Sequence, residues 1–105
     1  MIKPELYDVI ELLTDLPQVD IKAGELGTIV EKHNENAYEV EFSNSIGETL
    51  ACLAVKTDQF IVVWKNETHS WVSLADRINA MLQVIPEDGQ EKVLNFTRSL
   101  YKAIA

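Results

Sequence analysis

The spacing of the apolar residues changes near residue 70, and this change constrains the fold more than any other feature of the sequence. Up to Trp64, apolar residues alternate with polar ones or form short runs between glycines. From Ser73 onward they recur every three or four positions, which is the period of an amphipathic helix. The sequence therefore predicts an α+β chain, in which a small antiparallel β unit precedes a helical tail.

The β unit is predicted from five short runs of strand-forming residues. In the clearest run, Tyr38, Val40 and Phe42 alternate with Glu39 and Glu41, which is typical of a strand with one buried and one solvated face. The other runs are residues 6–13, 28–31, 49–55 and 60–64. Five short strands at this spacing predict a small, strongly bent barrel, which we expect to occupy residues 1–65.

The tail, residues 72–105, is predicted to be a two-helix hairpin. Ser73 precedes Asp76 at N-cap spacing, and Pro86 suits the first turn of a second helix. The first apolar stripe comprises Leu74, Ile78, Met81, Leu82 and Ile85, and the second comprises Val93, Leu94, Phe96, Thr97, Leu100, Tyr101 and Ile104. Whether the hairpin covers its own barrel or another chain is left open by the pattern.

The net charge of −8 is concentrated in the β unit. Residues 1–70 hold 13 acidic and 5 basic side chains, whereas residues 71–105 hold 4 of each. Such a barrel repels a phosphate backbone and favours a basic partner, although acidic charge also serves solubility. Nucleic-acid binding is therefore disfavoured.

Several segments resemble a known family. Asp8–Leu12, Asp15–Pro17, Gly27–Glu31 and Tyr38–Phe42 occur in the order found in a family of uncharacterised bacterial domains with an SH3-like barrel, and the resemblance spans residues 6–63. It implies a fold and no established activity, so it assigns no functional residue.

Two weaker resemblances bear on function. Ile85–Pro86 and Val93–Phe96 are similar to segments of small antitoxin-like or accessory proteins of bacterial gene pairs. The strand entry at Gly24 and Gly27 is similar to KOW-type barrels, which bind RNA. The chain departs from the KOW pattern because residues 33–36 contain no arginine and are flanked by glutamates.

We expect no catalytic, cofactor-binding or metal-binding residues, and hence no enzyme. Cys52 lies in an apolar run, so it is expected to be a buried structural cysteine. His33 and His69 are expected in polar turns, without the convergent ligands that a metal needs. Glu39 and Glu41 share a solvated strand face, so they are not expected to act as an acid and base pair.

The aromatic residues near the tail allow two interpretations. Trp71 either seals the hairpin onto the barrel or belongs to a surface for self-association or for a partner. Because each helix carries a broad apolar stripe and the barrel is small, a symmetric dimer through the tails is expected.

These observations predict a non-enzymatic interaction protein, antitoxin-like or accessory in type, with a nucleic-acid binding KOW-type barrel as the alternative. One cysteine and the lack of any stretch near the ~18 apolar residues of a membrane span favour a cytoplasmic location. The candidate residues for binding a possibly basic protein partner are Glu31, Glu39, Glu41, Trp71, Phe96, Leu100 and Tyr101.

Overall fold

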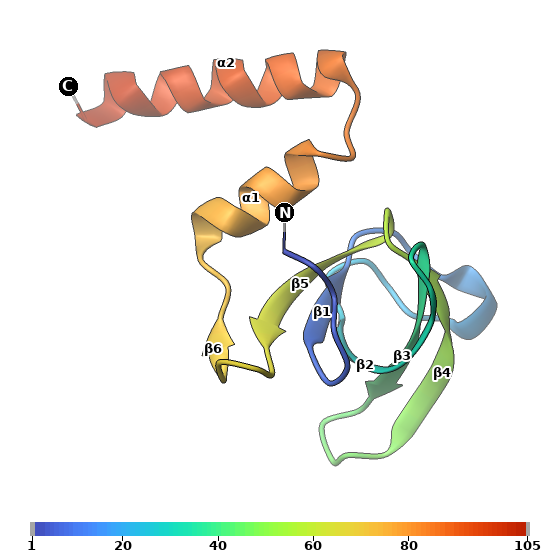
Figure 1. Ribbon diagram of the computed structural model, residues 1–105. Coiled ribbons are helices and arrows are strands. Elements are labelled where there is room, and N and C mark those ends of the chain that lie inside the picture. The colour runs from blue at the N-terminus through green and yellow to red at the C-terminus, as the bar shows by residue number, and fades with distance from the viewer. Residues whose placement is uncertain (1, 105) are drawn as a thin grey trace.

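The first two thirds of the chain form one antiparallel sheet that curls into a barrel-like unit (Figure 1). The computed structural model describes the backbone of residues 2–104 and the side chains of residues 2–102. The strands are β1 (Val9–Leu12), β2 (Leu26–Asn34), β3 (Ala37–Ser43), β4 (Thr49–Lys56), β5 (Phe60–Lys65) and β6 (Ser70–Trp71). Their order in the sheet is β4-β3-β2-β1-β5-β6.

The core lies inside this curl and follows the predicted alternation. Tyr38, Val40 and Phe42 of β3 are at most 1% exposed, whereas Glu39 and Glu41 point to the other face. Residues of β1, β2, β4 and β5 also belong to the core, namely Ile10, Leu12, Ile29, Val55, Phe60 and Val62, and residues outside these strands complete it, namely Leu16, Ile21 and Val72. The interpretation of residues 37–42 as a strand with one buried face is therefore confirmed.

The first strand is shorter than the apolar run that predicted it. Tyr7 adopts a positive φ of 69°, and the amide of Asp8 donates a hydrogen bond to the carbonyl of Glu5 over 3.1 Å. The backbones of Tyr7 and Asp8 still bond to Ile29 of β2, but the positive φ of Tyr7 interrupts the extended conformation, so β1 starts at Val9.

Two polar segments expected to be turns contain strand. β2 continues through His33 to Asn34, so His33 is a strand residue and the turn is confined to residues 35–36. The connector at residues 65–71 ends in β6, whose Trp71 pairs with Trp64 of β5. The sheet thus has a sixth strand beyond the five that the sequence predicted.

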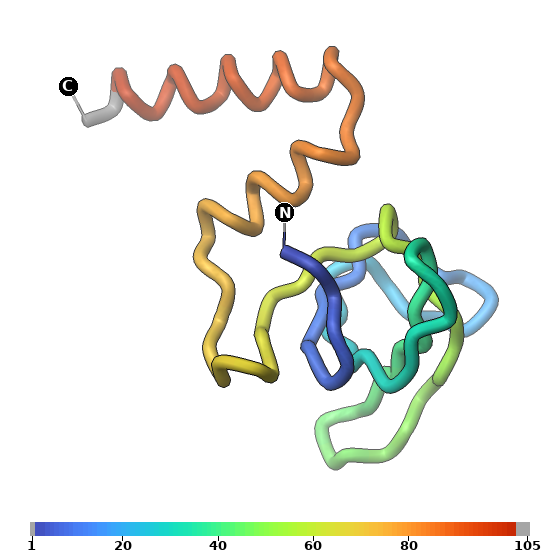
Figure 2. Tube along the Cα trace, viewed as in Figure 1, coloured from blue at the N-terminus to red at the C-terminus, as the bar shows by residue number. Residues whose placement is uncertain are grey.

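Two helices follow the sheet, which confirms the predicted α+β class and helical hairpin. The helix α1 (Leu74–Leu82) begins at Ser73, whose side chain accepts a 3.1 Å hydrogen bond from the amide of Asp76, as predicted. It packs against β5, and α2 (Glu87–Ile104) lies beyond it, away from the barrel (Figures 1 and 2). No helix among the described residues is long and apolar enough to cross a membrane.

The apolar stripe of α1 does not face the barrel. The residues of α1 and of the segment just after it that line the cavity between the helix and β5 are Asp76, Ala80, Gln83 and Val84. Leu74 and Ile78 are instead 72% and 50% exposed, and no residue of α1 is buried. The helix therefore turns its most apolar side outward, which is the reverse of a helix that covers a core.

Candidate interaction surfaces

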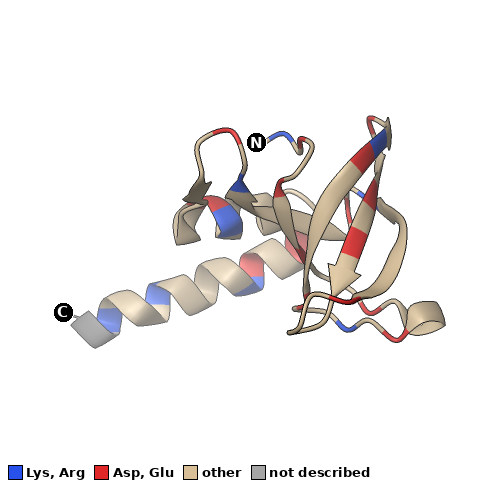
Figure 3. Cartoon of the chain, turned by 90° about the horizontal axis from the view of Figure 1, so that it is seen from below, with Lys and Arg blue, Asp and Glu red and all other residues tan. Residues whose placement is uncertain are grey.

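Three glutamates lie together on the outer face of the β2–β3 hairpin, and we call Glu31, Glu39 and Glu41 the acidic face. Glu39 and Glu41 are two residues apart on β3, and Glu31 of β2 pairs directly with Glu39. Acidic residues recur along the strands of the barrel in Figure 3. Like charges at opposed positions destabilise a strand pair, so this arrangement needs local compensation.

Glu39 receives that compensation from its neighbours. Its Oε1 lies 2.7 Å from His33 Nε2, and its Oε2 accepts a 3.4 Å hydrogen bond from Cys52 Sγ. The bond with His33 is the main reason that the pKa of Glu39 falls below its ordinary value. Glu39 is therefore held ionised at the centre of the acidic face.

Cys52 is exposed, and the expectation of a buried structural cysteine is wrong. On β4, Ala51 and Leu53 pack against the core, so Cys52 between them points outward. Partial desolvation, then the hydrogen bond to Glu39 and the charges of the acidic face, raise the pKa of the Cys52 thiol. A thiol with a raised pKa is less often ionised and is a poorer nucleophile at neutral pH.

Trp71 is 61% exposed, so the interpretation that it seals the hairpin onto the barrel is wrong. The Arg77 guanidinium carbon lies 5.8 Å from the centre of its ring, in a cation–π arrangement. Trp64 takes a different role, because its ring stacks on His69 with 5.6 Å between centroids. Val72, the residue after Trp71, is the buried apolar residue of this segment.

The other predicted contact residues gather on α2. Leu94, Phe96, Leu100 and Tyr101 are between 50% and 69% exposed, and we call them the α2 apolar face. The side chain of Ile104, which the sequence placed with them, lies outside the described residues. Trp71 belongs to β6, so the residues that the sequence predicted as tail contacts for a partner lie on two elements, β6 and α2.

A cavity of about 460 Å³ separates α1 from the barrel. Its walls come from the N-terminal arm (residues 2–6), β3 and the turn before it, β5 and the turn before it, and α1 with the residues after it; they include Ile2, Tyr38, Phe60 and Val84. Glu35, Asp58 and Asp76 line it as well. The sequence did not predict this cavity, because its walls are contributed by segments far apart in the chain.

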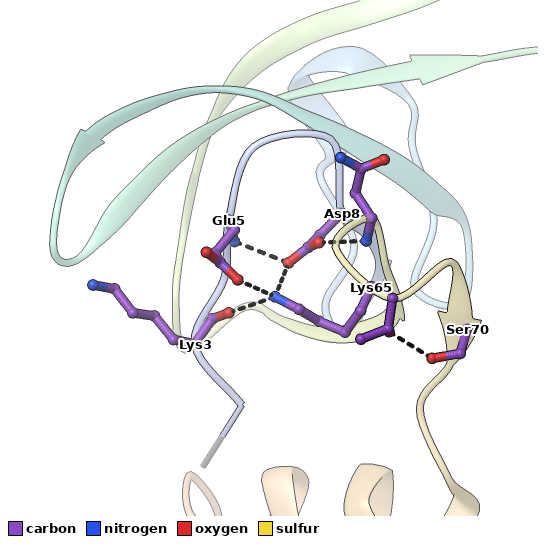
Figure 4. Close-up of polar contacts among 7 residues, drawn as sticks. Lys3, Glu5, Asp8, Lys65 and Ser70 are labelled. Carbon is purple, nitrogen blue, oxygen red and sulfur yellow. Dashed lines mark hydrogen bonds and ion pairs between the residues drawn. The ribbon is translucent and has the colours of Figure 1, made fainter.

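The N-terminal arm is held by a buried ion pair that the sequence also did not predict (Figure 4). Asp8 is fully buried, and Lys65 Nζ lies 2.5 Å from its Oδ2. Lys65 also donates to Glu5 Oε1 (2.9 Å), and the amide of Asn66 donates to Asp8 Oδ1 (2.9 Å). Burial lowers the pKa of Lys65, but the bonds to Asp8 and Glu5 outweigh it and raise the pKa overall. We call Glu5, Asp8 and Lys65 the N-terminal clamp.

Neither the clamp nor the acidic face forms a metal centre. Within the part of the chain that the structure describes, no three His, Cys, Asp or Glu side chains are arranged to hold a metal ion. Asp8 already accepts bonds from two amides and Lys65, so its role is structural.

Residues 6–62 match a family model described as Domain of unknown function (DUF4926). The match ends inside β5, so the two helices lie outside it. No curated protein and no solved structure matches the chain.

Proposed function

This chain belongs to the family of domains described as DUF4926, and we propose that it is a non-enzymatic protein–protein interaction module. The observation that carries this proposal is the exposure of the α2 apolar face. A helix in a folded protein gains most of its stability by packing an apolar stripe, yet no described side chain of α2 is buried. An exposed apolar patch of this kind is typical of a surface that contacts another protein chain.

The acidic face supplies a second, electrostatic element of the proposed function. Glu31, Glu39 and Glu41 would steer a basic protein partner toward the outer side of β2 and β3. Their charge also favours a protein over a nucleic acid, because phosphate binding depends on lysine and arginine. The KOW-type alternative is thus the weaker proposal.

Within this proposal the two parts of the chain have separate roles. The barrel, which we propose to be SH3-like and to occupy residues 1–65, recognises the partner. The tail, residues 72–105, supplies apolar contact through Trp71, Phe96, Leu100 and Tyr101. An antitoxin-like or accessory subunit acting in the cytoplasm would use both surfaces in this way.

The test of the acidic face compares two triple variants of the tagged chain. E31Q/E39Q/E41Q removes the face, and D20N/E25Q/E67Q removes the same charge from exposed positions elsewhere. Each is incubated with extract of the source cells, and retained proteins are quantified by mass spectrometry at two salt concentrations. We expect a basic protein to be retained by the wild type and the control, and about tenfold less by the face variant at low salt.

Equal retention by both variants would contradict the steering role of the acidic face. Nucleic-acid binding is measured separately with a fluorescent single-stranded RNA of mixed sequence. We expect no change in anisotropy at low salt, where phosphate contacts are strongest. RNA binding that weakens steeply with added salt would favour the KOW-type alternative.

A further inference from the structure

Apart from Lys92, the helix α2 carries its charges in two blocks of opposite sign. Glu87 and Asp88 lie in its first turn and Lys102 in its last, and Glu91 and Arg98 extend the two blocks. Figure 3 shows basic residues toward the C-terminal end of this helix. The arrangement complements the helix dipole, and it also gives α2 an acidic half and a basic half.

Four of these charges lie along one side of the helix, next to its apolar face. Because an α-helix turns about 100° per residue, Glu87, Glu91, Arg98 and Lys102 fall on the same side, adjacent to Leu94. All four are exposed. Charges that flank an apolar face set the orientation and the choice of partner when two helices pack together.

We propose that α2 packs antiparallel against α2 of a second copy of this chain, with the two-fold axis between Leu94 and Asn95. In this register Glu87 faces Lys102 of the second copy, and Glu91 faces Arg98 of the second copy. A two-fold axis repeats each pair, so four complementary contacts flank the interface. A parallel pair would instead place acidic half on acidic half and basic half on basic half.

The same register also matches the apolar residues. Val93 faces Phe96 of the second copy. Leu100 of the second copy lies level with Gly89, at the end of α2 where Ile85 packs beside the helix. Apolar contact and charge thus agree on one register.

A second copy fits this surface better than a basic protein does. The tail has as many basic as acidic residues, so it does not attract a basic partner, whereas the excess negative charge lies on residues 1–70. Pairing through the neutral tails also means that the two acidic barrels do not have to contact and repel each other.

The area of exposed apolar surface indicates that α1 takes part as well. A standard interface takes about 800 Å² from each chain, and the α2 apolar face supplies on the order of half of that. Exposed Trp71, Leu74 and Ile78 supply roughly the rest. The assembly is therefore a four-helix arrangement in which α2 provides the central contact and α1 the outer contact.

This inference rests on the interaction role proposed for the tail, and it is independent of the partner proposed for the acidic face. Its readout is the mass of the purified chain in solution, whereas the acidic face is tested by proteins retained from extract. Failure of one is therefore distinguishable from failure of the other.

The experiment measures the mass of the full chain by light scattering across a range of concentrations. The wild type is expected to show the mass of two chains. R98E/K102E makes the flank of α2 uniformly acidic, and E87K/E91K makes it uniformly basic, so each variant alone should dissociate with a dissociation constant raised about tenfold or more. An equimolar mixture of the two variants should restore the mass of two chains.

A matched pair of single reversals serves as the control. Lys92 lies about 120° around α2 from Arg98, outside the row of four charges, so K92E should leave the dimer intact, whereas R98E, with the same change in charge, should weaken it. Orientation is tested in a C52S background by mixing E87C and K102C chains and oxidising them. Linkage between the two different chains is expected.

Three results would overturn the proposal. One is a wild type with the mass of a single chain at every concentration. Another is a dimer that both double reversals leave intact. The third is efficient self-linkage of E87C, which would show a parallel pair.

Discussion

The strand β3 and the helix α2 carry equally regular apolar patterns, but the structure covers one and leaves the other exposed. Phe42 of β3 is fully buried, whereas Phe96 of α2 is 65% exposed. Both patterns predicted the correct element and the correct apolar side. The comparison teaches that periodicity defines a face, whereas the partner that covers the face depends on the neighbouring elements.

The neighbours of the two elements explain the difference. β3 has β2 and β4 on its two sides, and the curled sheet brings the other strands over its apolar face. α2 has α1 alone, and the contacts between the helices lie near their connection. There Gln90 Nε2 donates to the Leu82 carbonyl over 2.7 Å, and Gly89 faces Ile85. Beyond this point the α2 apolar face has no cover within the described chain.

The largest expected effect comes from truncating a phenylalanine in each region. F42A leaves a cavity in the core and should lower the free energy of unfolding by about 3–5 kcal/mol. F96A removes an exposed ring and should change the free energy of unfolding by less than about 0.5 kcal/mol. Urea denaturation of dilute protein, in which the wild type is a single chain, measures both values. A large loss in F96A under these conditions would mean that α2 packs on its own barrel.

The next effect concerns the N-terminal clamp, which ties the two ends of the barrel sequence together. K65M leaves the buried carboxylate of Asp8 without its cation and should cost about 3 kcal/mol. K56M, at an exposed lysine of β4, is the control and should cost less than about 0.5 kcal/mol. Equal unfolding midpoints for K65M and the control would show that Asp8 is solvated or neutral in the folded chain.

A smaller effect, of opposite sign in the two regions, is expected from adding a methyl group at two glycines. A Cβ at Gly27 would lie 2.6 Å from Val40 Cγ1 and 2.9 Å from Phe42 Cε1, so G27A should destabilise the chain by about 1–3 kcal/mol. A Cβ at Gly89 would meet Ile85 at an ordinary 3.6 Å. G89A should therefore stabilise α2 by about 0.5–1 kcal/mol, through helix propensity.

Helix content from circular dichroism and unfolding midpoints from urea titration measure the two glycine variants together. If G27A left the free energy of unfolding unchanged, Val40 and Phe42 would not pack as closely against Gly27 as the structure shows. If G89A lowered helix content, the space beside Ile85 would be smaller than described.

The same comparison shows how much the sequence could predict. Strand alternation in residues 37–42 and the N-cap at Ser73 depend on local pattern, and both predictions are confirmed. The pair of Asp8 and Lys65 joins residues 57 positions apart, and no local pattern encodes such a contact. The cavity beside α1 has the same origin, since four separate segments of the chain line it.

The error at Cys52 and the open choice at Trp71, for which the sequence allowed two interpretations, have a different cause. In the run 50–54 every residue is apolar, so no polar partner marked which residues point outward, and Cys52 was assigned to the wrong face. Trp71 is apolar in type, but its place on the two-residue strand β6 leaves most of the ring in solvent. Residue type alone therefore does not decide burial at either position, because burial depends on backbone direction.

The smallest expected effect lies within the acidic face and depends on pH. The bond with His33 lowers the pKa of Glu39 in the folded chain below its ordinary value of 4.5, so this bond stabilises the fold above that pH and is lost as the pH falls through the folded pKa. H33Q should therefore be less stable than the wild type in weakly acidic solution, by at most about 1 kcal/mol because the pair is at the surface. The two proteins should converge in stronger acid, where Glu39 is protonated.

The same substitution in an E39Q background separates this pair from other effects of His33. With no carboxylate at position 39, H33Q should have no pH-dependent effect on the unfolding midpoint. A pH-dependent effect that persists in E39Q would assign the coupling to Glu31 or Glu41 instead, since both lie on the same face. Compensation of Glu39 by His33 would then not explain how β2 and β3 hold two opposed glutamates. In either case the coupling is confined to the barrel, because the tail contributes no group to this face.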